Sequence, residues 1–213
     1  MRPVCVQHTG RRLVYVPIVH TMVDMGSQAQ TLKEESIRRL GAEQWEKSRR
    51  VIEEIWKGIG EKLLTLQLPW ERVRIYQDGL PLSGKELEIA QEVAAQGSKN
   101  YQIVMELVRR GARLMGTESP ELLTREYTHI KRVAEARTDA EREEARRRYA
   151  AESAELLKKR DAFIARRIAE TLEEGEVGLL FLGMMHEVDR LLPEEIQVEF
   201  LFDRLPLREV EEH

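Results

Sequence analysis

Four side chains able to do acid–base or metal chemistry each follow a short apolar run of the sequence. They are His20, Asp78, Glu118 and His186. If those runs are parallel strands, all four groups lie at the same carboxyl edge of one sheet, where open α/β folds bind ligands. Two imidazoles and two carboxylates at one edge are typical of a metal site or of an acid–base pair. The sequence therefore predicts a catalytic or metal-binding cleft at that edge.

Each of these residues also has an ordinary structural explanation. A histidine that follows a strand often organises a loop through hydrogen bonds, although two of them in equivalent places, His20 and His186, weaken that explanation. Asp78 precedes Gly79, and this pair suits a tight turn. Glu118 comes just before a helix start, where a carboxylate favours the positive end of the helix dipole. Both interpretations stay open for every one of the four.

Asp161 stands out because it interrupts an apolar helical stripe. The stripe consists of Leu157, Ile164, Ile168 and Leu172. Asp161 lies on this stripe, while its neighbour Arg160 points away from it around the helix. A carboxylate that faces a core needs a partner, since unpaired burial costs several kcal/mol. Asp161 therefore either forms a buried salt bridge that docks the helix or orients an imidazole at the sheet edge.

The elements that must position these residues are five short runs rich in Val, Ile, Leu and Tyr. They are Leu13–Val19, Val73–Tyr76, Ala112–Met115, Leu179–Leu182 and Ile196–Phe202. Such runs, bounded by Gly or Pro, are typical of strands. The first four lack a polar face, as expected for strands that are covered on both sides. The last alternates between apolar and polar residues.

Helical segments separate the runs. The signals are capping boxes at Ser27 with Gln30 and at Ser83 with Glu86, a Ser119-Pro120 helix start, an apolar face formed by Ile52, Ile55, Trp56, Ile59 and Leu63, and the charged stretch Thr138–Arg148. The segment that begins at Ser83 is expected to end near Arg110. The charged stretch is rich in Ala, Glu and Arg, which predicts a solvated helix with i,i+4 ion pairs.

This alternation predicts a single α/β domain over residues 1–213. Strands separated by helices imply right-handed crossovers and a mainly parallel sheet flanked by helices. The helical excess at about 120–174 is longer than one crossover needs, so we expect a helical hairpin inserted between the third and fourth strands.

Composition excludes several classes of protein. The 213 residues are 42% hydrophobic and 34% charged, which excludes a membrane bundle and a disordered chain. The net charge of −4 excludes an overall positive potential that would attract nucleic acid. The single Cys5 excludes an internal disulfide framework. With no signal peptide and no apolar run long enough to span a bilayer, we expect a soluble, cytoplasmic protein with no nucleic-acid or membrane partner.

Three further groups of residues have less defined roles. Met184 and Met185 are expected to pack in the core, with the soft wall of a pocket as the alternative. Trp45 and Trp56 could supply an apolar interface for a homodimer. His8, His129 and His213 have no supporting pattern and are not expected to take part in a site.

The order of the motifs resembles one enzyme superfamily, which contains the erythromycin esterases, the ChaN-type haem-binding proteins and the TraB/Tiki-type proteins. The matching pieces are Pro17-Ile18-Val19-His20, Tyr76-Gln77-Asp78, Arg160-Asp161 and Gly183-Met184-Met185-His186. The resemblance implies an α/β fold with helical insertions and both motif histidines at one cleft. Several members are hydrolases, and the Tiki type is metal-dependent. This chain has Pro17 where the family has Gly, and Gln77 where an acid is usual unless the acid is displaced to Asp78.

Two functions follow from these residues. The first is a hydrolase, acting on a small-molecule or peptide substrate, in which His20 and His186 bind a divalent metal or act as general base. Asp78 would be the third metal ligand, and either Asp78 or Glu118 would act as a catalytic carboxylate. Arg160 and Asp161 would contact these groups and orient them. The alternative is a non-catalytic protein that binds a small molecule or haem on the same scaffold, which the changes at Pro17 and Gln77 favour.

Overall fold

The protein is built on one parallel sheet of five strands. The computed structural model describes residues 10–19, 37–38 and 41–202. The strands are β1 (Arg11–Ile18), β2 (Val73–Gln77), β3 (Arg113–Met115), β4 (Val177–Gly183) and β5 (Ile196–Phe200). They lie in the order β3-β2-β4-β1-β5, and every neighbouring pair is parallel. The prediction of an α/β fold with a mainly parallel sheet is confirmed.

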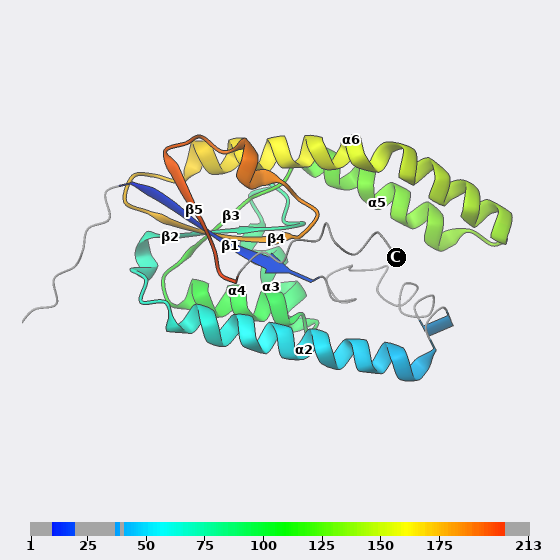
Figure 1. Cartoon of the computed structure of the whole chain (residues 1–213), viewed down its shortest axis with the longest axis horizontal. Coiled ribbons are helices and arrows are strands. Elements are labelled where there is room, and N and C mark those ends of the chain that lie inside the picture. Colours follow the sequence, from blue (N-terminus) through cyan, green and yellow to red (C-terminus); the bar gives the residue numbers. More distant parts are fainter. Residues whose placement is uncertain (1–9, 20–36, 39–40, 203–213) are drawn as a thin grey trace, which may run out of the picture.

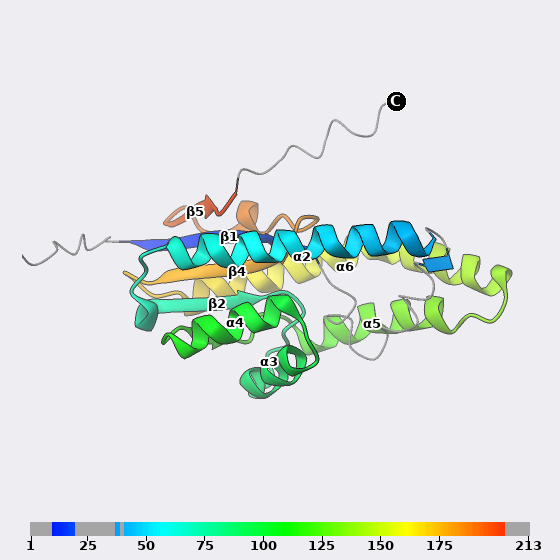
Figure 2. The same ribbon diagram turned by 90° about the horizontal axis from the view of Figure 1, so that it is seen from below.

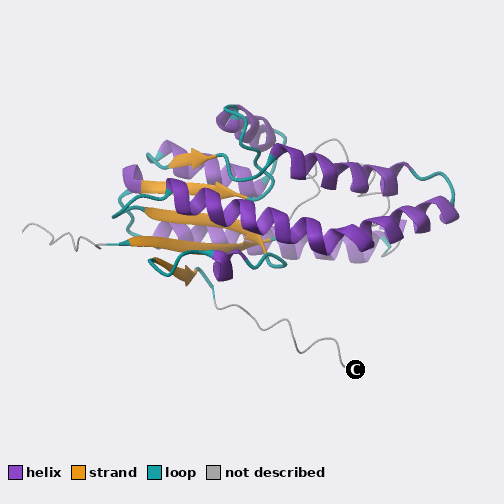
Figure 3. Ribbon diagram, turned by 90° about the horizontal axis from the view of Figure 1, so that it is seen from above, coloured by secondary structure: helices purple, strands orange, loops and turns teal. Residues whose placement is uncertain are grey.

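Helices cover both faces of this sheet (Figure 1). They are α2 (Ala42–Thr65), α3 (Glu86–Ala95), α4 (Lys99–Arg109), α5 (Pro120–Glu135) and α6 (Asp139–Thr171), with two short 3₁₀ turns, η2 (Trp70–Arg72) and η3 (Val188–Leu191). Helices α2 and α4 pack on one face (Figure 2), and α6 and η3 pack on the other. Helices α5 and α6 form the predicted hairpin, which extends well past the end of the sheet (Figure 3).

The alternation of side chains along each strand divides the core into two layers. In β4, Leu179 and Phe181 pack in the layer of α2 and α4, whereas Leu180 and Leu182 pack in the layer of α6. Because successive side chains of a strand point to opposite faces, a strand buried on both faces needs an unbroken apolar run. Strand β4 therefore has the sequence that its central position requires.

The connections that leave the carboxyl edge of the sheet go to both of its faces. After β1 the chain continues to α2, and after β2 it continues to α3 and α4, on one side of the sheet. After β3 it continues to α5, and after β4 to η3, on the opposite side. Strand β4 lies between β1 and β2, so neighbouring strands send their connections to opposite faces. Open α/β folds typically bind ligands where the connections of neighbouring strands diverge in this way.

The helix predicted to run from Ser83 to about Arg110 is two helices. Gly97, with φ of 102°, ends α3, and the Ser98 side chain caps α4 by accepting from the backbone N–H of Tyr101. The Ser83 side chain does not cap α3, which begins at Glu86. Instead, Glu86 accepts from the backbone N–H of Ser83. The sequence pattern missed the break because both halves carry an apolar stripe and only Gly97 marks the turn.

Trp56 is part of the core, so the expectation that it supplies a dimer interface is wrong. Its side chain is 1% exposed, and its indole N–H donates to the carbonyl of Val19 at 3.2 Å. It shares a stripe of α2 with Ile59 and Leu63, and this stripe faces the sheet. Ile55, which was assigned to the same face, is exposed. The capping pair Ser27 and Gln30 lies outside the described residues.

None of the described helices is both long enough and apolar enough to cross a membrane.

Candidate functional site

Asp78, Glu118, Arg160, Asp161 and His186 converge at the carboxyl edge of the sheet. They come from the segments that follow β2, β3 and β4 and from the sheet-facing side of α6. All five side chains are buried. Of the six residues that the sequence predicts for the site, these five lie together in one polar cluster, and the sixth is His20.

Arg160 is the centre of this cluster. Its Nε donates to Glu118 Oε2 at 2.7 Å, and its Nη2 donates to Glu118 Oε1 at 2.5 Å and to Asp78 Oδ1 at 2.8 Å. Its Nη1 pairs with Glu126 of α5. Burial alone would lower the pKa of Arg160, but these hydrogen bonds and charges raise it above its ordinary value. The guanidinium therefore stays charged and holds three carboxylates from three separate segments.

Asp78 both forms a turn and belongs to the site. Its backbone N–H donates to the carbonyl of Phe181 at 2.8 Å, and Gly79 after it has φ of 74°. Its Oδ2 accepts from the backbone N–H of Gly183 at 3.1 Å. Because Gln77 follows Ile75 by two residues, its side chain lies on the α2 and α4 face. Asp78 is thus the acidic residue of this segment that reaches Arg160.

Glu118 sits beside Arg160 and has no role as a helix cap. It is 0% exposed, and its Oε1 also accepts from the backbone N–H of Gly79 at 2.9 Å. The cap of α5 is Ser119, whose side chain accepts from the backbone N–H of Leu122. Burial raises the pKa of Glu118, the Arg160 hydrogen bonds oppose this rise, and the nearby Asp78 carboxylate adds to it.

His186 lies between two carboxylates. Its Nδ1 contacts Asp161 Oδ1, and its Nε2 is 3.7 Å from Asp78 Oδ2. The other oxygen of Asp161 accepts from the backbone N–H of Glu187 at 2.9 Å, which fixes the carboxylate against the loop that carries the imidazole. The partner that the apolar stripe required for Asp161 is therefore the imidazole of His186. The carboxylate of Asp161 thus lies against Nδ1 and that of Asp78 lies nearer Nε2, so each side of the imidazole ring faces an acid that can orient it.

His20 lies outside the described residues. It comes two residues after Ile18, the last residue of β1, and Ile18 pairs in register with Gly183 at the end of β4. Of the ligand set predicted for a metal, His186 and Asp78 lie next to each other. In the part of the chain that the structure describes, no group of three His, Cys, Asp or Glu side chains is arranged to hold a metal ion. A metal site here would need a further ligand such as His20.

Sequence reasoning missed Glu126 and Tyr149, which extend the cluster into the hairpin. The Tyr149 hydroxyl donates to Glu126 Oε1 at 3.1 Å. Burial, followed by the Glu126 charge, raises the pKa of Tyr149 to about 12. His129 is buried and stacks on Tyr149 with ring centroids 5.4 Å apart, and its Nε2 lies 3.3 Å from Glu152 on the outer side of the hairpin, away from Arg160. The charged composition of this region is typical of a solvated surface, and only the packing of α5 on α6 brings these groups together.

Comparison of the chain with protein-family models, with curated proteins and with solved structures found no match.

The raised pKa of Glu118 predicts a pH dependence of stability. Because the folded protein holds the Glu118 proton more tightly than the unfolded chain does, its contribution is complete below the unfolded pKa of about 4.5. That contribution is lost as the pH rises through the folded-state pKa. Glu118→Gln should remove this pH-dependent contribution to the free energy of unfolding, which changes by at most about 1.4 kcal/mol per pH unit. Urea unfolding of both proteins between pH 4 and pH 8 measures it, and parallel curves would contradict the assignment.

Proposed function

We propose that this protein is a hydrolase of esters or amides, with His186 as the general base and Asp161 as the group that orients it. The observation that carries the proposal is the contact of His186 Nδ1 with a carboxylate that is itself anchored by the backbone N–H of Glu187. The position of this pair at the carboxyl edge of a parallel sheet supports the proposal, as does the resemblance of the motifs to the erythromycin esterase superfamily.

The chemistry follows from the roles of the two imidazole nitrogens. Asp161 would hold the Nδ1 proton and stabilise the imidazolium, so that Nε2 could accept a proton from a water molecule. The activated oxygen would then attack the carbonyl carbon of the substrate. The imidazolium would return the proton to the leaving group.

Asp78, Glu118 and Arg160 would shape the cleft beside the base. Arg160 fixes Asp78, whose Oδ2 lies 3.7 Å from His186 Nε2, so this carboxylate would orient the imidazole from its Nε2 side. Glu118 accepts from Arg160 and from the backbone N–H of Gly79, so it would fix the guanidinium against the turn that carries Asp78. In this arrangement Arg160 positions the carboxylates and does not touch the substrate.

A metal-assisted form of the same reaction would use Nε2 of His186, Asp78 and His20 as ligands. A carboxylate that holds the second nitrogen of a histidine is a common arrangement behind metal ligands, and Asp161 has that geometry. A divalent ion bound there would supply an activated water at neutral pH. Elemental analysis of untagged protein and of its His20→Ala and His186→Ala variants distinguishes this form from the metal-free one.

The experiment that tests the proposal is a hydrolysis screen with a matched histidine control. We expect wild-type protein to hydrolyse at least one member of a panel of chromogenic esters and peptide amides. His186→Ala should lower kcat/KM about a hundredfold to ten-thousandfold. His129→Ala removes another buried imidazole, in the hairpin, and should leave kcat/KM within a few-fold.

Hydrolysis that is unchanged in a folded His186→Ala variant would contradict the proposal. The same scaffold would then be better explained as a non-catalytic protein that binds a small molecule or haem at this edge. Absorption spectra after haem addition, together with a small-molecule binding screen, would be the next measurements.

A further inference from the structure

Glu126 joins the first helix of the hairpin to the polar cluster at the sheet edge. One of its carboxylate oxygens, Oε2, pairs with Arg160 Nη1, and the other, Oε1, accepts from the Tyr149 hydroxyl at 3.1 Å. The Glu126 side chain is 23% exposed, so water reaches it only in part. Both carboxylate oxygens of Glu126 are therefore bound by protein groups, one in the site and one in the hairpin.

The contact with Glu126 binds the last nitrogen of the Arg160 guanidinium. The Nε and Nη2 atoms of Arg160 donate to Glu118 and Asp78, which belong to the segments after β3 and β2. Nη1 is the remaining nitrogen, and Glu126 is its partner. Because a guanidinium is planar and rigid, a carboxylate that holds one nitrogen also limits the directions of the other two. The position of the guanidinium relative to Asp78 thus depends on how α5 lies against α6.

A continuous chain of contacts leads from Arg160 to the proposed base. Asp78 Oδ1 accepts from Arg160 Nη2 at 2.8 Å, and Asp78 Oδ2 lies 3.7 Å from His186 Nε2. The side chains of Arg160, Asp78 and His186 are all buried, so water cannot take the place of a lost contact. A rotation of the guanidinium would turn the Asp78 carboxylate and move the negative charge that faces the imidazole. The hairpin is therefore connected to His186 through side chains that have little freedom to move independently.

We propose that Glu126 is a positioning residue of the hydrolase. It holds Arg160, and through Arg160 the carboxylate of Asp78, in the arrangement that the base His186 requires. This inference rests on the proposed function. Tyr149 has the same role one contact further away, since its hydroxyl fixes Glu126 Oε1. The α5–α6 hairpin is then a working part of the active site, and a change in how its two helices pack changes the rate of hydrolysis.

A matched contact in the hairpin separates positioning from simple attachment of α5 to α6. Glu152 of α6 lies 3.4 Å from Arg125 and 3.3 Å from His129, which both belong to α5. It joins the same two helices, but it precedes Arg160 by about two turns of α6. Glu152→Gln is therefore the control for Glu126→Gln, because each substitution removes one negative charge from a contact between the two helices.

Hydrolysis of p-nitrophenyl acetate by the two variants tests the positioning role. We expect Glu126→Gln to lower kcat about tenfold or more and to change KM less than about twofold, because the base is misplaced while the substrate still binds. Tyr149→Phe should lower kcat by a smaller factor, since the Glu126 carboxylate stays on Arg160. Glu152→Gln should leave kcat and KM within about twofold. Equal losses of kcat in Glu126→Gln and Glu152→Gln would overturn the proposal, because attachment of the helices alone would then explain them.

Nitrogen NMR separates the failure of this inference from the failure of the proposed function, because it needs no substrate. The signals are the Nε–H group of Arg160 and the two ring nitrogens of His186. In Glu126→Gln we expect the signals of both residues to shift, whereas Glu152→Gln should leave them in place. Shifts confined to Glu126→Gln support the positioning network, whether or not the ester is hydrolysed. His186 signals that do not move in Glu126→Gln overturn the inference, even if His186→Ala abolishes hydrolysis.

Discussion

Methionine in place of Arg160 should lower the free energy of unfolding by about 3–5 kcal/mol. The substitution keeps an unbranched side chain in α6 but leaves Asp78, Glu118 and Glu126 without their shared counter-charge. The side chains of Asp78 and Glu118 are 3% and 0% exposed, so water cannot replace the guanidinium. In a domain of this size the loss corresponds to a decrease in Tm of roughly 6–20 °C.

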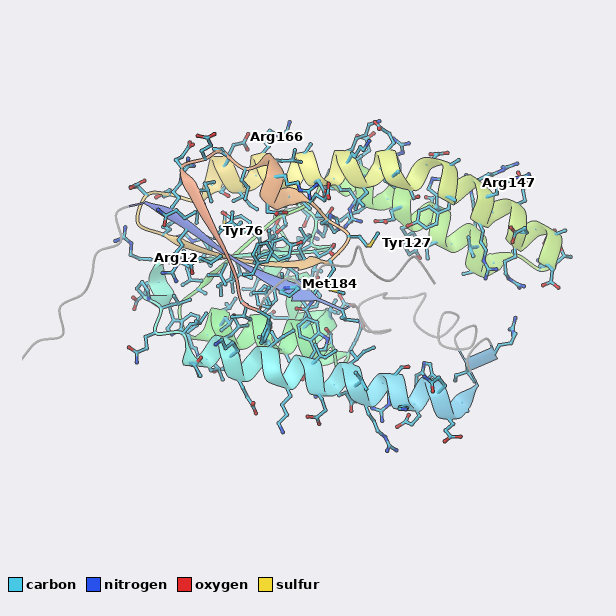
Figure 4. The ribbon with its side chains drawn as sticks, in the orientation of Figure 1. Arg12, Tyr76, Tyr127, Arg147, Arg166 and Met184 are labelled. Carbon is cyan, nitrogen blue, oxygen red and sulfur yellow. The ribbon has the colours of Figure 1, made fainter. Side chains whose placement is uncertain are left out.

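Arg166→Met is the matched control for this measurement. Arg166 lies in the same helix (Figure 4). Its side chain is 63% exposed, and its ion pair with Glu170 is 4.0 Å long. Its replacement should change stability by less than about 1 kcal/mol. Adding Glu118→Gln to Arg160→Met should recover part of the loss, because one of the unpaired charges is removed. A change at Arg160 no larger than the change at Arg166 would show that the cluster is not held by this guanidinium.

The fold was predictable because each strand has its own local signal. The apolar runs that became β1, β2 and β4 lack a polar face, and that pattern predicts the two-sided burial that these strands show. For β3 the same expectation is wrong, because this strand lies at the edge of the sheet, with Arg113 exposed and Leu114 and Met115 half-buried. Pro120 marked the start of one helix of the hairpin, and the charged stretch Thr138–Arg148 marked the beginning of the other. Such signals depend on residues close together in the sequence. The break at Gly97 was missed because one glycine is a weaker signal than the apolar stripe that continues through it.

The site was predictable only where the topology determines it. Asp78, Glu118 and His186 follow parallel strands, so any parallel arrangement brings them to one edge. Asp161 was recognised because a carboxylate on an apolar stripe requires a partner, although the sequence did not specify which one. Glu126 carries no such signal, since its position in α5 resembles that of many solvated acids. Its role depends on how α5 lies against α6, and the sequence pattern does not determine that geometry.

Two of the wrong predictions about apolar residues concern the direction in which the backbone points a side chain. Trp56 was placed on an apolar helix face but also offered for a dimer interface, and Met185, which is exposed, was assigned to the core although it follows Gly183. Residue type determines the gain from burial, whereas the direction of the backbone determines whether burial is possible. A turn immediately after a strand directs even an apolar side chain into water.

Asparagine in place of Asp161 should lower kcat for hydrolysis about a thousandfold to ten-thousandfold and change KM little. The amide is nearly the same size as the carboxylate, so it can still accept from the backbone N–H of Glu187 through its oxygen. Its NH₂ group would then face His186 Nδ1 and donate to it, which places the imidazole proton on Nε2. In that tautomer Nε2 cannot accept a proton, and the negative charge that stabilises the imidazolium is gone.

Imidazole ¹⁵N spectra test this mechanism apart from the rate. The proton of the neutral His186 ring should lie on Nδ1 in the wild type and move to Nε2 in Asp161→Asn. Asp139→Asn, a fully exposed aspartate in the first turn of the same helix, controls for the loss of one negative charge and should alter neither kcat nor the tautomer. A large loss of kcat with the tautomer unchanged would assign Asp161 to electrostatic stabilisation alone. An unchanged kcat together with a proton moved to Nε2 would remove His186 as the base, because an imidazole with its Nε2 protonated cannot take a proton from water.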